Sequence, residues 1–350
     1  MMQDENQKKV LDERTDIDVL FFPRTSPSKP FVGLSLAALF PFFTGVATGL
    51  LLRLIFSGNA NRSFAPMGIG FMLFAPFAVG AITVYIAERQ SRREWNYYFF
   101  AAAFANLLFI VGTFFSLFEG VICIIIATPL FCVVGGLGGL TMGAICRLTN
   151  WPKQSTFCFV LLPLMLGLAP EDTSTHQTFR TIERSSIIAA TPEQIWQQLH
   201  KTKDIQANEV GNAWMYKIGV PLPLAGVTSQ KDGRLVRRVN MGKLIYFDQI
   251  ASEWKTNEFV HWQYQFYEDS FPANALDEHV KIGGAYFDLI DTRYTLKRIS
   301  SQATELKISM QYRVSTGFNW YAIPVAQLLI GNFEDVILKF YQRRSESNEG

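Results

Sequence analysis

The chain has 350 residues, 49% of them hydrophobic, and a formal net charge of +2. Its length fits two domains. The net charge is near neutral and no basic stripe is interleaved with aromatic residues, so no nucleic-acid partner is predicted. The four cysteines all lie in apolar runs and lack zinc-type spacing, so they predict neither a thiolate metal site nor a disulfide framework.

The first half of the chain is predicted to be a membrane domain. Residues 1–30 are polar, carry both charge signs and hold three prolines, which predicts a flexible tail. Four apolar runs then reach or exceed the ~20 residues that a helix needs to cross a bilayer. They cover residues 31–56, 65–87, 97–118 and 121–148, and a shorter fifth run covers 156–169. We therefore predict a transmembrane helical domain over residues 31–170 with four or five spans.

The distribution of lysine and arginine predicts the orientation of these spans. Basic residues are concentrated in the tail and in the second and fourth connections, whereas the first connection has only Arg62 and the third has none. The positive-inside rule then places the N-terminus in the cytoplasm. Five spans deliver the C-terminal domain to the opposite face of the cell (inner) membrane, which is our expectation, and four spans leave it in the cytoplasm.

Glycines and charges within the apolar runs are expected to be structural. Gly135, Gly139 and Gly143 stand four residues apart, which indicates close helix packing, whereas a nucleotide-binding loop has no preceding strand. Arg53 and Glu119 lie near run ends, where snorkelling or a turn explains them. With no central acid, base or histidine, the runs give little support to a transporter.

After a short polar linker at residues 171–178, the pattern changes to that of a soluble α+β domain. Residues 180–189 read as a strand. Thr191 and Gln194 then have the spacing of a capping box, and Pro192 suits the first position of the short helix that follows. Further strands are predicted at residues 213–218, 235–241, 244–254, 258–267, 285–299 and 304–315. Residues 231–233 are a plausible hairpin turn, and residues 270–284 look like an inserted loop at the rim of a cavity.

The last apolar stretch, residues 317–344, predicts one long amphipathic helix. Apolar residues recur at steps of three and four and form one wide stripe that must be buried, with the strands as its partner. Because a proline inside a helix is costly, the regular helix is expected to begin near Pro324. Arg343 and Arg344 end it favourably.

This order of elements resembles the SRPBCC superfamily, which includes START-like and polyketide cyclase/dehydrase-like domains. The resemblance rests on residues 190–196 after the first strand, on residues 233–237 and on the closing helix from Asn319 to Arg344. It covers about residues 179–345. It implies a helix-grip fold, a curved antiparallel sheet around the long helix that leaves an apolar cavity. Members bind lipids, sterols or polyketide-like compounds, and no catalytic set is carried over.

Strand parity and the helix stripe predict which side chains line that cavity. The candidate ligand-pocket residues are Arg237, Trp262, Tyr264, Tyr286, Asp288, Tyr294, Met310, Tyr312, Leu329, Phe333, Val336 and Phe340, with Val260, Phe266 and Ile290 on the same faces. Aromatic stripes of this kind also fill ordinary cores.

Two charges among the candidates, Arg237 and Asp288, face inward by the same parity. Buried charges pair, so they form either a structural bridge or the polar end of a ligand site. Neither a metal site nor a cofactor is predicted, since the four histidines have no convergent partners.

The leading interpretation is a membrane-anchored START-like domain that binds an apolar or amphiphilic small molecule. A cyclase or aromatase, which would need polar cavity groups beyond Arg237 and Asp288, is the second interpretation. An interaction or regulatory module whose interior is simply packed core is the third.

Overall fold

The computed structural model describes residues 36–59, 62–116, 119–149, 158–169, 176–273 and 275–347. The predicted tail at residues 1–30 and most of the linker at 171–178 lie outside these ranges. We describe the apolar helices and the C-terminal domain each by itself.

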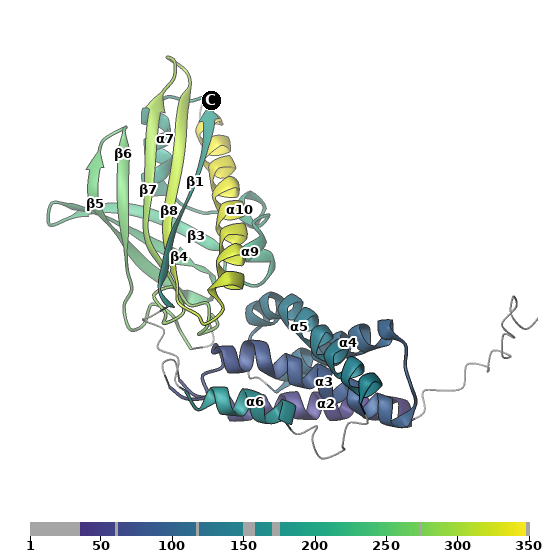
Figure 1. Cartoon of the computed structure of the whole chain (residues 1–350). Helices are drawn as coiled ribbons and strands as arrows, with labels where there is room; N and C mark the ends of the chain where they lie inside the picture. Colours follow the sequence, from purple (N-terminus) through teal and green to yellow (C-terminus); the bar gives the residue numbers. More distant parts are fainter. Residues whose placement is uncertain are drawn as a thin grey trace, which may run out of the picture. The chain divides into compact units, whose positions relative to one another are not determined.

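The apolar runs form helices, shown from purple to teal in Figure 1. They are α2 (Leu36–Ile55), a π-helical turn η1 (Gly70–Phe74) that continues into α3 (Ala75–Gln90), α4 (Trp95–Phe115), α5 (Val121–Leu148) and α6 (Cys158–Gly167). Four of these segments, with η1 and α3 taken together, are long and apolar enough to cross a membrane. Helix α6 has only ten residues, or about 15 Å of helix, so a fifth crossing stays a prediction.

The glycines of α5 pack as predicted. A side-chain carbon on Gly80 of α3 would collide with the backbone of Gly135, and one on Gly139 would collide with the carbonyl of Tyr98 in α4. Helix α5 runs without interruption from Val121 to Leu148, so the glycines belong to a helix face and not to a nucleotide-binding loop.

The charges at the run ends form an ion pair that the sequence did not predict. Arg53 is 6% exposed and lies 2.8 Å from the Glu119 carboxylate, while its guanidinium also donates to the Phe56 carbonyl at 2.7 Å. The two residues therefore pair with one another, and Glu119 lies in a bend between α4 and α5, which fits the predicted turn. Pairing lowers the cost of burying both charges.

The C-terminal domain is one antiparallel sheet of eight strands with the order β1-β8-β7-β6-β5-β4-β3-β2. The strands are β1 (Thr178–Ile188), β2 (Lys201–Thr202), β3 (Pro223–Lys231), β4 (Arg234–Met241), β5 (Tyr246–Lys255), β6 (Phe259–Gln265), β7 (Phe287–Arg298) and β8 (Thr304–Val314). The helices are α7 (Pro192–His200), α8 (Ala207–Val210), α9 (Trp214–Lys217) and α10 (Asn319–Glu346).

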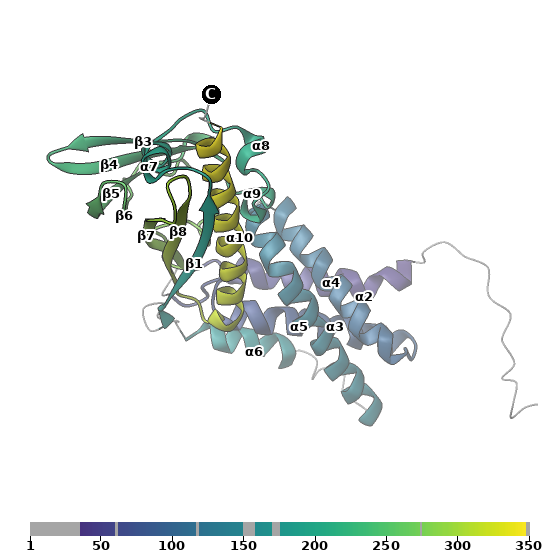
Figure 2. The same cartoon turned by 90° about the horizontal axis from the view of Figure 1, so that it is seen from above.

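The sheet curves around α10, as Figures 1 and 2 show. The apolar stripe of α10 supplies Ile330, Ile337, Leu338, Phe340 and Tyr341 to the core between helix and sheet. This α+β arrangement agrees with the predicted helix-grip fold. Burial of the stripe, rather than helix propensity, stabilises α10 in its place.

Turn and cap chemistry explains where several elements begin and end. Thr191 accepts a hydrogen bond from the Gln194 amide, and the Gln194 side chain accepts one from the Thr191 amide, so the predicted capping box is confirmed. Asp232 and Gly233 take φ values of 51° and 75° between β3 and β4, which confirms the hairpin turn.

Three local predictions were wrong. Residues 213–218, read as a strand, contain the short helix α9, and strands β2 and β3 were missed. β3 carries Pro223 and Gly226, which are poor strand formers, and tertiary pairing overrides that preference. Helix α10 begins at Asn319 rather than near Pro324. Pro324 falls in the second turn and removes a single hydrogen bond, a cost that packing of the helix offsets.

Candidate functional site

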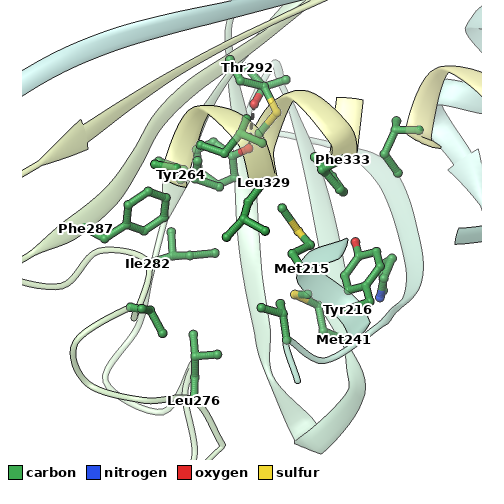
Figure 3. Close-up of a pocket in the computed structure, with 18 of the residues that line it drawn as sticks. Met215, Tyr216, Met241, Tyr264, Leu276, Ile282, Phe287, Thr292, Leu329 and Phe333 are labelled. Atoms are coloured by element: carbon green, nitrogen blue, oxygen red, sulfur yellow. Dashed lines mark hydrogen bonds between the residues drawn. The ribbon is translucent and has the colours of Figure 1, made fainter. Parts of the chain in front are cut away.

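A cavity of about 290 Å³ lies between the inner face of the sheet and α10. Figure 3 shows Leu329 and Phe333 pointing into it from the helix, opposite Met215, Tyr216 and Met241. Its wall is mostly apolar. The apolar lining includes Met215, Val220, Met241, Phe247, Leu276, Ile282, Phe287, Leu289, Met310, Leu329, Ile330, Phe333, Ile337 and Phe340.

Small residues open this space. Ala322 and Ala326 line the cavity from the first half of α10, and Ala225 and Gly226 line it from β3. Larger residues of α10, Phe340 and Tyr341, line it farther along the helix, and both side chains are 2% exposed. Small residues in the first half of α10 therefore leave space that the aromatic residues of its second half narrow.

Arg237 of β4 forms a polar end in the otherwise apolar cavity. Its side chain is 7% exposed, and its guanidinium donates to the Tyr341 hydroxyl at 3.0 Å and to the Gln249 side-chain oxygen at 3.5 Å. Among the residues that the structure describes, no carboxylate forms an ion pair with it, and its Nε has no hydrogen-bond partner. Arg237 thus brings a buried positive charge to the cavity without a countercharge.

Gly226 makes room for this guanidinium. A side-chain carbon on Gly226 would come within 2.6 Å of an Arg237 Nη atom and 2.7 Å of its Nε. Val239, two residues along β4 from Arg237, is the register partner of Gly226. Glycine at this point of β3 therefore lets the arginine side chain lie flat against the neighbouring strand.

Further hydroxyl groups surround the polar end. The Tyr264 hydroxyl lies 2.6 Å from the Thr292 hydroxyl, drawn as a dashed line in Figure 3. The Tyr294 ring stands edge-on to the Tyr341 ring, with centroids 6.0 Å apart. Burial raises the pKa of Tyr264 and of Tyr294, so both hydroxyls stay neutral donors or acceptors near pH 7.

His200 lies close to this end but is not part of the cavity wall. Its Nδ1 is 3.0 Å from the Thr228 hydroxyl, and its ring packs on Trp196 with centroids 4.3 Å apart. Burial, helped by the charge of Arg237, lowers the pKa of His200 to about 4. The imidazole is therefore neutral at physiological pH, and Arg237 alone carries the charge here.

The structure brings most of the predicted pocket residues to the cavity. Those in its wall are Arg237, Tyr264, Tyr286, Tyr294, Met310, Leu329, Phe333 and Phe340. Trp262 and Tyr312 are instead fully buried in the core, with exposures of 1% and 0%, and Val336 packs against the same core. Val260 is core as well.

Asp288 and Ile290 were predicted to face inward, but neither lines the cavity. One feature of β7 explains both errors. The register of β7 against β8 shifts between Leu289 and Asp291, and this bulge reverses the parity of the strand. Phe287 and Leu289 therefore face inward before the bulge, and Asp288 does not. Its carboxylate accepts a hydrogen bond from the Gly283 amide at 2.7 Å, so the expected contact with Arg237 is absent.

Several wall residues were missed by sequence reasoning. Met215 and Tyr216 lie in α9, which was read as a strand, and Leu276 and Ile282 come from the loop that was predicted only as a rim. Gln249 and Tyr341, hydrogen-bond partners of Arg237, were also missed. Of these, Gln249 could have been found from strand pairing. Gln249 is the register partner of Arg237 across β4 and β5.

Comparison with known proteins finds similar solved structures for about half of the chain. No family model matches it, and no curated protein matches it. The Zhui aromatase/cyclase from Streptomyces sp. R1128 is 10% identical, with 49% of this chain and 96% of that chain covered and a TM-score of 0.31. A START superfamily protein from Mycobacterium smegmatis is 13% identical, with 48% and 98% covered and a TM-score of 0.33.

A third similar structure is norcoclaurine synthase from Thalictrum flavum, 9% identical, with 50% and 98% covered and a TM-score of 0.31. Similarity at this level assigns neither ligand nor activity. Any function must therefore be argued from the cavity of this chain.

Proposed function

We propose that the C-terminal domain binds an amphiphilic small molecule, lipid-like or polyketide-like, and that the apolar helices anchor it in a membrane. The ligand is apolar along most of its length and ends in a carboxylate, phosphate or carbonyl group at Arg237. The observation that carries this proposal is a buried arginine without a countercharge at the end of an apolar cavity.

The physical argument starts from the cost of burying charge. An isolated ion in a low-dielectric interior is expensive, and buried cations are normally paired. Among the described residues, the partners of Arg237 are neutral oxygens, those of Tyr341, Gln249 and Tyr294, and its Nε donor is unused. An anionic group would satisfy that donor and neutralise the charge through charge-assisted hydrogen bonds.

The cavity agrees with this kind of ligand in size and surface. Its volume of about 290 Å³ is at the lower end of small-molecule sites, which span roughly 300–1,000 Å³. Its existence argues against the third interpretation, in which the interior is only packed core. Four N-terminal segments long and apolar enough to cross a bilayer support a membrane as the source of the ligand.

The binding experiment compares two neighbouring arginines. Arg237→Met removes the buried charge, whereas Arg238→Met removes a partly exposed arginine that pairs with Asp248 on the other face of β4. With the purified full chain, we expect Arg237→Met to weaken palmitate binding about tenfold to a hundredfold, as loss of a charged hydrogen bond implies. Hexadecanol binding should change much less, and Arg238→Met should change neither.

Equal loss for palmitate and hexadecanol, or equal effects of the two substitutions, would refute the role of Arg237. Thermal unfolding of both variants provides the folding control. If the variant unfolds at the wild-type temperature and fails to bind only palmitate, the defect comes from the missing charge and not from a damaged fold.

A cyclase- or aromatase-type enzyme is the second candidate. The observation in its favour is that the polar end holds groups beyond Arg237, namely Gln249, Tyr264, Thr292, Tyr294 and Tyr341. Such groups could orient and polarise carbonyls of a linear poly-β-ketone. Incubation of the full chain with such a compound, followed by mass analysis of dehydrated cyclic products, tests this candidate. Product formation no faster than in buffer counts against it.

A further inference from the structure

The turn between β4 and β5 has a backbone that its residues do not favour. Lys243 takes φ 56° and ψ 29°, and Leu244 takes φ 61°. The Ile245 amide donates back to the Gly242 carbonyl at 3.4 Å, and the Met241 amide donates to the Ile245 carbonyl at 2.8 Å. Two consecutive positive φ values define the tight hairpin turn that is normally made by Asn-Gly or Asp-Gly.

The same sheet contains a turn that obeys this rule. Between β3 and β4, Asp232 and Gly233 occupy the two positions with positive φ. Lysine and leucine carry a Cβ that strains the left-handed region, and leucine lacks the short polar side chain that lets aspartate or asparagine adopt it. The β4–β5 turn therefore departs from the chemistry that this fold uses elsewhere.

Packing does not explain the departure. Leu244 is 82% exposed, and Lys243 is exposed too, whereas the next residue, Ile245, is 2% exposed. A strained leucine whose side chain is surrounded by solvent contributes no burial that would offset the strain. Strain of this kind without local compensation is a reason to look for a function.

The turn lies at the rim of the cavity. Met241, the residue before it, lines the cavity, and so does Val220 in the preceding loop. The Gly242 amide donates to the Leu222 carbonyl at 2.8 Å and joins the turn to that loop. Figure 3 shows Met241 close to Met215 at one side of the pocket.

This rim is also at the end of the sheet where the chain enters the domain. Because neighbouring strands are antiparallel, β1 begins at the same end at which β4 finishes and β5 begins. Seven residue steps separate Ala169, just after α6, from His176, just before β1. Fully extended, such a stretch spans at most about 25 Å. The end of the sheet that bears Leu244 is therefore the end that this stretch joins to α6.

We propose that the Lys243-Leu244 turn enters the interface of the phospholipid bilayer that holds the apolar helices, and that it brings the cavity rim to the lipids it takes up. Leu244 is placed among the first acyl carbons and Lys243 at the phosphate groups, an arrangement typical of residues at a membrane surface. This inference rests on the proposed function, because it requires both the membrane anchor and a lipid-like ligand.

A depth measurement tests the location of the turn. The full chain, carrying an environment-sensitive fluorescent amino acid at position 244, is reconstituted into mixed phosphatidylcholine and phosphatidylglycerol vesicles. Phospholipids with a nitroxide quencher on the acyl chain should quench the probe at 244. A matched probe at position 232, in the Asp232-Gly233 turn at the opposite end of β4, should not be quenched. Equal quenching at both positions overturns the proposal.

A shielded but unquenched probe at 244 also overturns the proposal, since it indicates that protein, such as a second copy of this chain, covers the turn. Quenching can be measured even if the cavity holds no ligand. The location of the turn is therefore tested separately from ligand binding.

A turn replacement tests the role in uptake. Changing Lys243→Asn together with Leu244→Gly installs the favoured turn residues, and the unfolding temperature should stay equal or rise. Uptake of a fluorescent fatty acid from vesicles should slow about tenfold, the factor expected when one buried leucine is lost from an interface.

Binding of the same fatty acid added from detergent should remain unchanged. Unchanged uptake from vesicles contradicts this inference and leaves the proposed function intact. Absence of fatty-acid binding in the wild-type chain by either route contradicts the proposed function itself.

Discussion

The guanidinium of Arg237 donates a hydrogen bond to the hydroxyl of Tyr341 at 3.0 Å and so joins the middle of β4 to the last third of α10. Both side chains are almost fully buried, with exposures of 7% and 2%. This contact holds the charged end of the cavity in place from two elements that are 104 residues apart in sequence. It orients the arginine while leaving its Nε free for a ligand.

Removal of the Tyr341 hydroxyl should destabilise the fold. Tyr341→Phe leaves a buried cation with one partner fewer, and we expect a loss of about 1–3 kcal/mol in the free energy of unfolding. Tyr312→Phe is the matched control, because the Tyr312 hydroxyl is buried and has no hydrogen-bond partner within the described part of the chain. Its removal should be neutral or stabilising. Denaturant unfolding of both variants measures the difference, and equal losses would show that the Arg237 contact adds nothing.

The buried face of α10 should dominate the stability of the C-terminal domain. Phe340→Ala is expected to cost about 3–5 kcal/mol, because a fully buried aromatic side chain leaves a void. Phe333→Ala should cost less, since Phe333 is only partly buried and already faces a cavity. Gln342→Ala removes one side-chain contact with Glu346 and should cost little. Equal unfolding temperatures for the three variants would contradict the docking of α10.

Glu334 should make stability depend on pH. This α10 residue is 0% exposed, and neither carboxylate oxygen has a hydrogen-bond partner among the residues that the structure describes. Burial raises the pKa of Glu334 from 4.5 to about 8, against the opposing charge of Arg184 on β1 and with support from Asp335 and Glu183. Between these two pH values the folded chain holds a proton that the unfolded chain has released, so stability falls as pH rises through this window.

The expected slope is at most about 1.4 kcal/mol per pH unit for one proton. Glu334→Gln should remove it and stabilise the protein most above pH 8. Asp335→Asn, at an exposed neighbouring position, should keep the wild-type slope. Unfolding temperatures measured from pH 6 to 9 test this, and a Glu334→Gln profile parallel to wild type would be the contrary result.

Membrane topology is open to a direct test. From the positions of the basic residues, we expect a cytoplasmic N-terminus and a C-terminal domain on the opposite face. A reporter that is active only in the cytoplasm, fused after Gly350, should then be silent, and the same reporter fused before Met1 should be active. Activity at both ends would show that residues 156–169 do not cross.

The sequence predicted the sheet-and-long-helix arrangement of the C-terminal domain because the signals for it were local and periodic. The α10 stripe, the Thr191 capping box and the Asp232-Gly233 turn each follow from short-range chemistry. Arg237 could be placed on the inward face because β4 pairs with β5 in regular register from Val236 to Asn240.

Asp288 could not be placed in this way. The bulge in β7 is set by pairing with β8, and one extra residue turns every preceding side chain to the other face. The size of the predicted cavity was equally out of reach, because it depends on Ala322, Ala326 and Gly226 meeting across elements that are distant in sequence. The missing countercharge of Arg237 is visible only once its neighbours are known.

The most direct test of the account is native mass spectrometry of the full-length protein released gently from its membrane, with wild type and Arg237→Met compared. The account predicts a bound anionic amphiphile on the wild-type protein and a greatly reduced amount on the variant. The comparison is made at equal amounts of protein, and the two proteins should unfold at the same temperature. Wild-type protein that carries no small molecule, or the same molecule bound to the same extent in Arg237→Met, would contradict it.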